Sequence, residues 1–345
     1  MTSKEKASPR RKSGWMKYIT KRKFEIELDD NCLPFVFDLP ESSLIMIKTI
    51  KDVKTFSDYV DSSQILVAGM DTETRPSFFN NKSSVKLSNG RYPTALIQLA
   101  LRNAAGVITV FLLDLIALCD PNAALLSEHP SMIMLDKTLS SIFMNHNCYK
   151  LGQGLANDMR ELCESYPVMT CFKDMVSIVE TNDLHNFIEP PDPDMRINTK
   201  SLKYIVKTYL HSNLIKTQQL SDWAKRPLKQ EQIQYAASDA LVLIRLFDAM
   251  LCEAEEKVSM NTNISEFNIE NLFSIFTYAP LTSRKKRKSS SLSEYDPVAH
   301  RSCFSVQERE YISECAHSGG DSGSFTIPLP EGLGLHSRFE SGSSE

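Results

Sequence analysis

An apolar run that ends in two closely spaced carboxylates constrains this chain more than any other feature. Residues 65–70 (ILVAGM) have strand character, and Asp71 and Glu73 follow with only Thr72 between them. Because side chains alternate between the faces of a strand, both carboxylates point to one face, roughly 7 Å apart, and Thr72 points to the other. Like charges this close raise each other's pKa unless a cation lies between them. The alternative is a strand end that simply enters solvent.

Two later segments supply further acidic side chains. In EQIQYAASDALVLIRLFDAM, the apolar residues follow the spacing of one buried helix face, and Tyr235 and Asp239 lie four residues apart beside that face. Asp158 lies in the first turn of a helix expected at 156–166, directly after a short strand expected at 148–154. Both segments also have an ordinary explanation. Tyr235 and Asp239 would be a packed pair at the border of a helix, and Asp158 would be a carboxylate that the helix dipole stabilises.

The four carboxylates and the phenol are more informative as a set than singly. Oxygen ligands without cysteine or histidine suit hard cations such as Mg²⁺ and Mn²⁺. A pair of such ions, about 3.5–4 Å apart, can clamp the attacking and departing oxygens of a phosphoryl displacement. We therefore expect Asp71, Glu73, Asp158 and Asp239 to lie together in space.

Hydrophobic periodicity predicts an α/β fold. The expected strands are 65–70, 94–101, 107–115 and 148–154, and the expected helices are 134–145, 156–166, 198–210 and 230–257. Short connections join the first three strands, which favours antiparallel pairing. The later strands alternate with helices, so we expect a mixed sheet that is covered by helices.

Three segments carry a resemblance to a known family. GMDTETRPSF, LGQGLANDMREL and YAASDALVLIRLF resemble the three motifs of the DEDD 3′–5′ exonucleases. Tyr235, four residues before Asp239, is similar to the mark of the tyrosine branch, which includes ribonuclease D and the Werner-syndrome exonuclease. YPTALIQLAL resembles the second strand of the family, and QLSDWAKRPLKQEQIQYAASDA resembles the approach to the third motif in Werner-type members. The likeness spans roughly residues 65–250.

This resemblance implies a ribonuclease-H-like fold, with a mixed sheet of five or six strands flanked by helices. It implies stepwise release of nucleoside 5′-monophosphates from single-stranded or recessed 3′ ends. The catalytic and metal-binding set would be Asp71, Glu73, Asp158 and Asp239 with two Mg²⁺ or Mn²⁺ ions, and Tyr235 would position the attacking water. The Werner-like approach favours DNA slightly. Processing of RNA 3′ ends is the alternative, and a non-catalytic nucleic-acid-binding adaptor is a further one.

Several other residues are candidates for contact with nucleic acid. The backbone of Thr72 is expected near the 3′ end, and Phe78 is expected to stack on a terminal base. Arg91, in the polar loop between the first two strands, and Lys225 and Arg226, in DWAKRPL, are expected to bind phosphates. The alternatives are that the loop with Arg91 is only solvated and that Phe78 belongs to the core. Lys225 and Arg226 would then be ordinary surface charges.

The chain divides by composition into four parts. We expect a basic flexible arm at 1–24, an exonuclease domain at 40–260, a possible packed extension at 261–281 and a disordered Ser/Gly-rich tail at 282–345. The tail contains RKKRK, which indicates a nuclear import signal, whereas the basic arm alternatively indicates an organelle presequence. The tails are also where protein partners are expected.

Charge and cysteine content limit the possible partners. Residues 24–281 carry a net charge of −11, so binding of nucleic acid would depend on local basic clusters and on the arm. The eight cysteines form no C-x-x-C pair, which predicts free thiols and a reducing compartment. No apolar run reaches the ~20 residues of a membrane span, so we expect no membrane association.

Overall fold

A computed structural model describes residues 32–79, 86–190, 199–260 and 268–279. The predicted arm, the tail and the RKKRK cluster lie outside these described residues. Among the described helices, none has both the length and the hydrophobicity that crossing a bilayer requires.

One mixed sheet organises the domain. Its strands are β1 (Leu44–Ile47), β2 (Ile65–Thr74), β3 (Thr94–Asn103), β4 (Ile108–Asp114), β5 (Tyr149–Gly152), β6 (Asp174–Glu180) and β7 (Ser274–Thr277). They lie in the order β1-β4-β3-β2-β5-β6-β7. The strands β2, β3 and β4 pair antiparallel, as predicted, while β5 runs parallel to β2 and β6 runs parallel to β5. The fold is the α/β, ribonuclease-H-like arrangement that the sequence predicted.

Within the described residues the sheet has seven strands instead of the five or six expected. Three strands were not among those expected by residue: β6 and the two edge strands β1 and β7.

The edge strand β1 pairs parallel with β4, and β7 pairs antiparallel with β6. Each has only four residues, which is too short for a periodic pattern to be visible in the sequence. Strand β7 comes from the segment 261–281, whose described part, 268–279, therefore packs on the domain.

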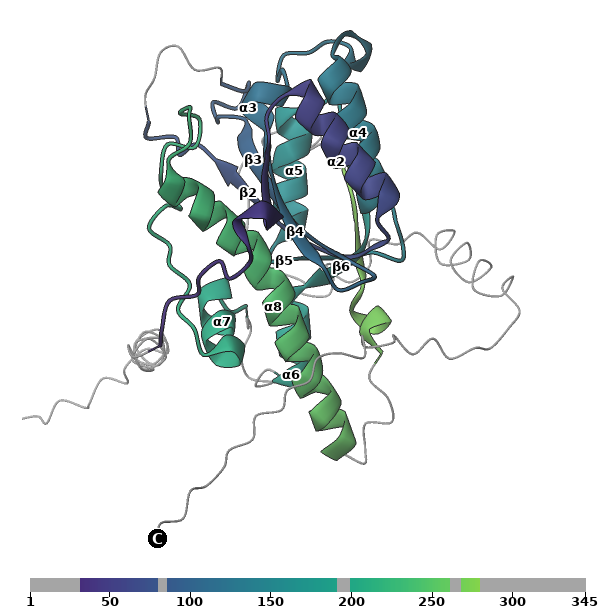
Figure 1. Cartoon of the computed structure of the whole chain (residues 1–345), viewed down its shortest axis with the longest axis vertical. Coiled ribbons are helices and arrows are strands. Elements are labelled where there is room, and N and C mark those ends of the chain that lie inside the picture. The colour runs from purple at the N-terminus through teal and green to yellow at the C-terminus, as the bar shows by residue number, and fades with distance from the viewer. Residues whose placement is uncertain (1–31, 80–85, 191–198, 261–267, 280–345) are drawn as a thin grey trace, which may run out of the picture. The chain divides into compact units, whose positions relative to one another are not determined.

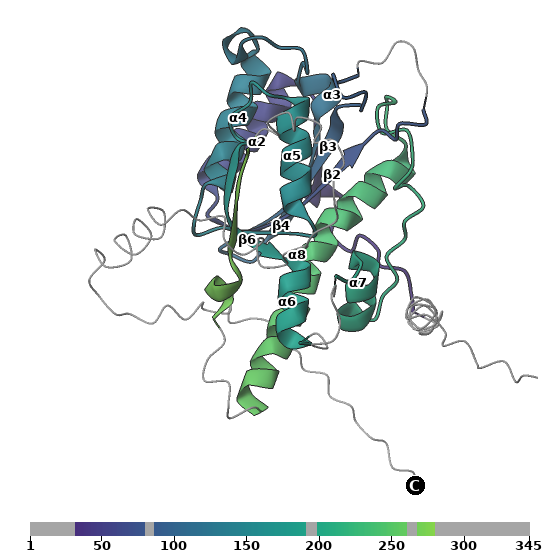
Figure 2. The same ribbon diagram turned by 180° about the vertical axis from the view of Figure 1, so that it is seen from behind.

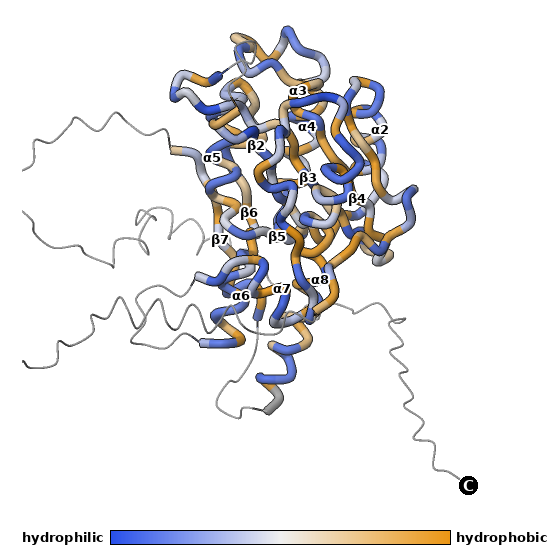
Figure 3. The backbone as a smooth tube through the Cα atoms, turned by 90° about the vertical axis from the view of Figure 1, so that its left-hand side faces the viewer, coloured by the Kyte–Doolittle hydropathy of each residue, from blue (hydrophilic) through white to orange (hydrophobic). Residues whose placement is uncertain are grey.

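Helices cover both faces of the sheet (Figures 1 and 2). They are α2 (Ile50–Ser62), α3 (Leu115–Leu118), α4 (Pro130–Phe143), α5 (Leu155–Ser165), α6 (Thr181–Ile188), α7 (Leu202–Leu210) and α8 (Gln230–Met260), with 3-10 turns η1 (Glu41–Ser43), η2 (Leu126–Glu128) and η3 (Ile269–Leu272). Helices α2, α4 and α5 share one core with the sheet, and α6, α7 and α8 share the other. Residues 94–101 of β3 are all buried, and hydrophobic segments run through the centre of the domain (Figure 3).

The long helix α8 packs closely against β2 at Gly69. A Cβ atom added at Gly69 would lie 2.6 Å from the Ala240 carbonyl oxygen, so only glycine fits at this position. Asp71 lies two residues after Gly69, and Asp239 directly precedes Ala240. This contact therefore fixes how near the two acidic residues can come.

The cysteines that the structure describes are all free, as the sequence predicted. They are Cys32, Cys119, Cys148, Cys163, Cys171 and Cys252. Burial raises the pKa of the Cys119 thiol to about 12 and that of Cys148 to about 11, so these thiols remain protonated near neutral pH.

Candidate active site

The two carboxylates of β2 point toward α8. Gly69 faces α8, so the alternation along the strand places Asp71 and Glu73 on that same face and Thr72 on the opposite one. The Thr72 hydroxyl donates a hydrogen bond to Asp158 Oδ1 on α5, at 2.9 Å, and its backbone N–H donates to Asp71 Oδ1, also at 2.9 Å. Thr72 therefore links the carboxylates on the two faces, and its predicted contact with nucleic acid stays a prediction.

Asp239 of α8 completes a compact acidic cluster with the two residues of β2. One carboxylate oxygen from each of Asp71, Glu73 and Asp239 lies within 4.8 Å of the other two. Glu73 and Asp239 are buried, and Asp71 is half-buried. An all-oxygen donor set at this separation fits a hard divalent cation such as Mg²⁺ or Mn²⁺.

The pKa shifts of the three carboxylates also favour a bound cation. Burial raises the pKa of Asp71 to about 6 and that of Asp239 to about 8, the latter with a contribution from the Asp71 charge. Burial and the neighbouring charges of Asp71 and Asp239 raise the pKa of Glu73 to about 10. It is therefore unfavourable for all three carboxylates to be ionised at once, and a bound cation would stabilise their ionised forms.

Asp158 lies beside this cluster, at the start of α5. The helix begins after Gly154, whose φ of 84° places it in the left-handed region. The Glu180 carboxylate at the end of β6 accepts hydrogen bonds from the N–H groups of Gly154 at 2.6 Å and Leu155 at 2.9 Å. Burial, and then the charge of Asp71, raise the pKa of Asp158 well above its usual range. Three of the four predicted carboxylates therefore form the cluster, and Asp158 is near enough for the Asp71 charge to affect its pKa but is not one of the three.

Tyr235 lies one turn before Asp239 on the same helix. Its hydroxyl lies close enough to the Asp239 carboxyl to lower the pKa of Asp239, and burial together with the Asp239 charge raises the pKa of Tyr235. Its ring packs on that of the fully buried Trp223, with the centroids 6.0 Å apart. The phenol is therefore held in a fixed position and stays protonated.

Two arginine–aspartate pairs hold the segment before α8 against the sheet. Arg75, at the end of β2, donates to Asp222 at 2.9 Å. Arg226 donates to both oxygens of the buried Asp114 at 2.6 and 2.7 Å, and to the Trp223 carbonyl at 2.6 Å. These pairs place Trp223 behind Tyr235.

Arg226 has a partner inside the protein that the sequence did not predict, and its contact with phosphate stays a prediction. Its guanidinium is directed inward, at Asp114 and at backbone carbonyls, and its side chain is only 24% exposed. The physical reason is that a buried carboxylate such as Asp114 needs a cationic partner.

The other predicted nucleic-acid contacts lie at the surface. Phe78 is 64% exposed, and its ring lies 4.7 Å from that of Phe79. Arg91 is half exposed and forms an ion pair with Glu161, and Lys225 is exposed. These three positions are accessible to a ligand, and their contact with nucleic acid stays a prediction.

Comparison with known proteins agrees with this geometry. Residues 44–255 match the family described as 3′–5′ exonuclease. The chain belongs to the 3′–5′ exonuclease family. It is 27% identical over 205 residues to the human exonuclease mut-7 homolog, covering 58% of this chain and 21% of that protein. It is 29% identical over 240 residues to exonuclease mut-7 of Caenorhabditis elegans, covering 65% of this chain and 24% of that protein.

The exonuclease thus spans about a fifth to a quarter of the length of these curated relatives. Among solved structures, the Aedes aegypti Nibbler EXO domain is similar, with a TM-score of 0.49 and 19% identity, covering 64% of this chain and 93% of that one. The family membership confirms the resemblance inferred from the motifs and identifies the domain as a 3′–5′ exonuclease, a hydrolase.

Lys216 is a candidate residue of the exonuclease that sequence reasoning missed. It is exposed, lies in the connection between α7 and α8, and its charge lowers the pKa of both Asp71 and Asp239. It is therefore a cation close to the acidic cluster. Only the fold brings it there, because nothing in the local sequence LIKTQQ points to the site.

Gln98 is a second missed residue, and its signal was present in the sequence. It is the one polar residue in the apolar run 95–101, lies opposite Asp71 in the β2–β3 register, and is fully buried. Its amide lies close enough to Glu73 to lower the pKa of that carboxyl, yet no described residue offers it a well-formed hydrogen bond. A buried amide that lacks a well-formed hydrogen bond and lies beside carboxylates suits a site that takes up a hydrated ion.

A groove of about 380 Å³ opens beside Tyr235 and Asp239. Residues 35–37, 214, 215 and 217 form one side, and residues from the first turns of α8, between 230 and 239, form the other. The first side is mostly apolar, whereas the second carries amide, hydroxyl and carboxylate groups. The groove is therefore continuous with the acidic cluster.

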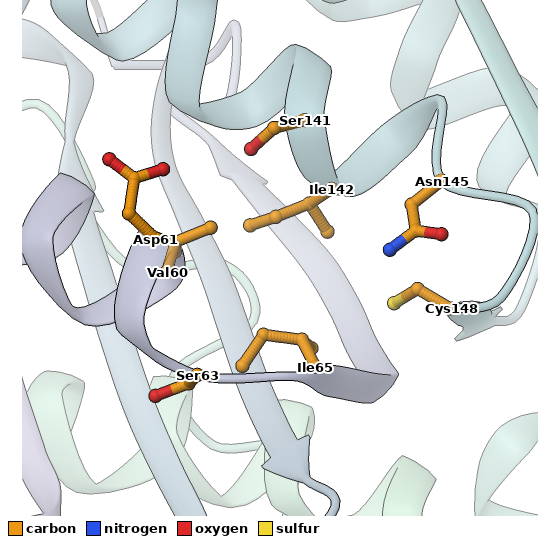
Figure 4. Close-up of a pocket in the computed structure, with 8 residues that line it drawn as sticks. All are labelled: Val60, Asp61, Ser63, Ile65, Ser141, Ile142, Asn145 and Cys148. Atoms are coloured by element: carbon orange, nitrogen blue, oxygen red, sulfur yellow. The ribbon is translucent and has the colours of Figure 1, made fainter.

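A second hollow, of about 230 Å³, lies at the opposite end of β2 (Figure 4). The end of α2, Ile65 at the start of β2 and the end of α4 line it, and Asp61 and Cys148 lie at its edge. No lysine, arginine or histidine is among its lining residues, so it offers no charge for a phosphate. It plays no part in the site described above.

Proposed function

We propose that the domain hydrolyses the terminal phosphodiester bond of nucleic acid with two divalent cations and releases nucleoside 5′-monophosphates from 3′ ends. The observation that carries this proposal is the convergence of Asp71, Glu73 and Asp239 within 4.8 Å. These three carboxylates and Asp158 are the proposed ligands. Bound there, the cations would lower the pKa of the attacking water and stabilise the departing 3′ oxygen.

The remaining site residues have roles that follow from their positions. Tyr235 stays protonated and is held by Trp223, so its hydroxyl can orient the attacking water by hydrogen bonding. Lys216 provides a positive charge beside the carboxylates, where it can pair with a substrate phosphate. The Thr72 hydroxyl holds Asp158 in place.

Digestion of a 5′-labelled oligonucleotide tests the proposal. With Mg²⁺ or Mn²⁺ the wild-type chain should shorten it one nucleotide at a time, and Asp71→Asn and Asp239→Asn should each slow the reaction by about 100-fold or more. Asp61→Asn, which alters an exposed carboxylate at the other end of β2, is the matched control and should remain active. Variants at the cluster as active as wild type would refute the assigned site.

Between the two kinds of nucleic acid, the first candidate is DNA, on the Werner-like sequence of residues 219–240. RNA is the second candidate, because Thr217, Gln234 and Ser238 line the groove with groups that can hydrogen-bond a ribose 2′-hydroxyl. Digestion of matched DNA and RNA strands side by side, each single-stranded and with a recessed 3′ end, separates the two. A higher kcat/KM for the DNA strand supports the first candidate, and a higher kcat/KM for RNA supports the second.

A further inference from the structure

A short N-terminal strap, residues 32–39, precedes the part of the chain that matches the exonuclease family, residues 44–255. The Phe35 N–H donates to the Asn213 carbonyl at 2.8 Å, and the Asn213 N–H donates to the Leu33 carbonyl at 2.8 Å. Further along, Arg245 of α8 pairs with Asp38 at 3.1 Å. The strap is thus attached at both ends and lies next to α7 and α8 (Figures 1 and 2).

Three consecutive residues of the strap, Phe35, Val36 and Phe37, line the groove. Phe35 and Phe37 are half-buried and pack on the hydrophobic core beneath α8. Val36, between them, is 63% exposed and lines the groove together with Ile215, which is 44% exposed. The strap therefore presents apolar surface to a groove that nothing described in the structure fills.

The opposite side of the groove is a polar surface on α8. Gln230, Gln234 and Ser238 are spaced by four residues and form one row on the helix. Glu231, Tyr235 and Asp239 form the adjacent row, which ends in the acidic cluster. The groove thus has one apolar side and one hydrogen-bonding side, and it leads to the carboxylates.

We propose that this groove binds the base and sugar of the 3′-terminal nucleotide, and that the strap forms the wall on which the base lies. This inference rests on the proposed function. A volume of about 380 Å³ is within the range of small-ligand sites, roughly 300–1,000 Å³. The apolar side suits the face of a base, and the amide and hydroxyl groups suit the sugar and the base edge.

The position of the groove places the rest of the nucleotide. Because Asp239 lines the groove and also belongs to the acidic cluster, a nucleoside in the groove has its 5′ phosphate beside the carboxylates. Lys216, which neighbours Ile215, lies near that phosphate as well. The strap is therefore a specificity-determining segment that lies outside the family match.

Photocrosslinking tests where the terminal base lies. An oligonucleotide with 5-iodouracil at its 3′ end is irradiated with the full chain in Ca²⁺, and the linked peptide is mapped by mass spectrometry. We expect links within residues 33–39 or 214–217. The same base placed six nucleotides from the 3′ end is the control and should not link there. Links from the terminal base that fall only elsewhere would overturn the inference, and if the wild type still shortens oligonucleotides the proposed function stands.

Two substitutions on the strap provide a second test. Val36→Asp puts a charge into the groove and should raise KM for an oligonucleotide, and the inhibition constant of a mononucleotide product, by about tenfold. Leu33→Asp alters a residue of the same strap that is 78% exposed and does not line the groove, so it is the matched control. Both residues are exposed, so both variants should keep the wild-type Tm. Equal KM values for the two variants would contradict the assignment.

Discussion

At the scale of single residues, the site depends on the absence of a side chain at Gly69. Asp71 and Asp239 lie on different elements, and they meet only because α8 lies directly on β2 at this glycine. The Ala240 carbonyl that a Cβ atom would meet belongs to the backbone, so no change of rotamer can relieve the contact.

Gly69→Ala should therefore displace α8 and weaken both the fold and the activity. We expect a loss of about 1–3 kcal/mol in the free energy of unfolding, measured with denaturant, and a fall in kcat. Gly106→Ala is a control for kcat only: nothing lies within 4 Å of a Cβ at that position, but its φ of 79° is left-handed, so alanine there also costs stability. It should leave kcat unchanged, because the site is distant. Wild-type kcat in Gly69→Ala would show that this packing does not position the carboxylates.

Residue patterns revealed the acidic set but not its surroundings. The spacing of Asp71 and Glu73, and of Tyr235 and Asp239, was enough to place each pair on one face, and the structure has both pairs so placed. Lys216 and the Thr72–Asp158 hydrogen bond were not predictable, because they arise from contacts between elements that are distant in sequence.

At the scale of elements, the segment between α7 and α8 sets the position of the first turns of α8. Arg75 and Arg226 attach it to the ends of β2 and β4 through Asp222 and Asp114. The neighbouring Lys225 is exposed. Two adjacent basic residues with the same predicted role therefore differ in what they contact.

Substitution of these neighbours should separate structure from binding. Arg226→Gln leaves Asp114 buried without its cation, and we expect a loss of about 3–5 kcal/mol in stability, seen as a lower Tm. Lys225→Gln should keep the wild-type Tm and raise KM only, as expected for a surface contact with phosphate. A stable Arg226→Gln chain, or an unstable Lys225→Gln chain, would reverse these assignments.

The sequence predicted most of the long elements, but it missed helix α2 and strand β6, which have 13 and seven residues, as well as the short edge strands. Helix α8 and strands β2, β3 and β4 have enough residues for a clear period, although β2 continues to Thr74, beyond the predicted 65–70. Strands β1 and β7 have four residues each, and only pairing with β4 and β6 makes them strands. The sequence thus predicted the four central strands β4, β3, β2 and β5, while the edge strands depend on tertiary contacts.

At the scale of the whole molecule, the buried carboxylates link stability to pH and to metal. In the unfolded chain they titrate near pH 4. In the folded, metal-free protein the pKa of Asp71 is raised to about 6 and that of Asp239 to about 8. Between these limits the folded state binds more protons than the unfolded state, so its stability decreases as pH rises from about 4 to about 8.

Denaturation across this pH range, in EDTA and in saturating Mg²⁺, measures the linkage. In EDTA the free energy of unfolding should fall toward pH 8. In Mg²⁺ the fall should be smaller, because the ion binds the ionised carboxylates of the folded state. Identical curves with and without Mg²⁺ would argue against a cation at this cluster.

Calorimetric titration of the full chain with Mn²⁺ tests the convergence of the carboxylates on a metal most directly. We expect saturable binding by the wild type, with affinity reduced by about tenfold or more in Asp71→Asn and in Asp239→Asn, while Asp61→Asn binds as the wild type does. Binding of equal affinity and stoichiometry by wild type and by the two cluster variants would contradict the central claim.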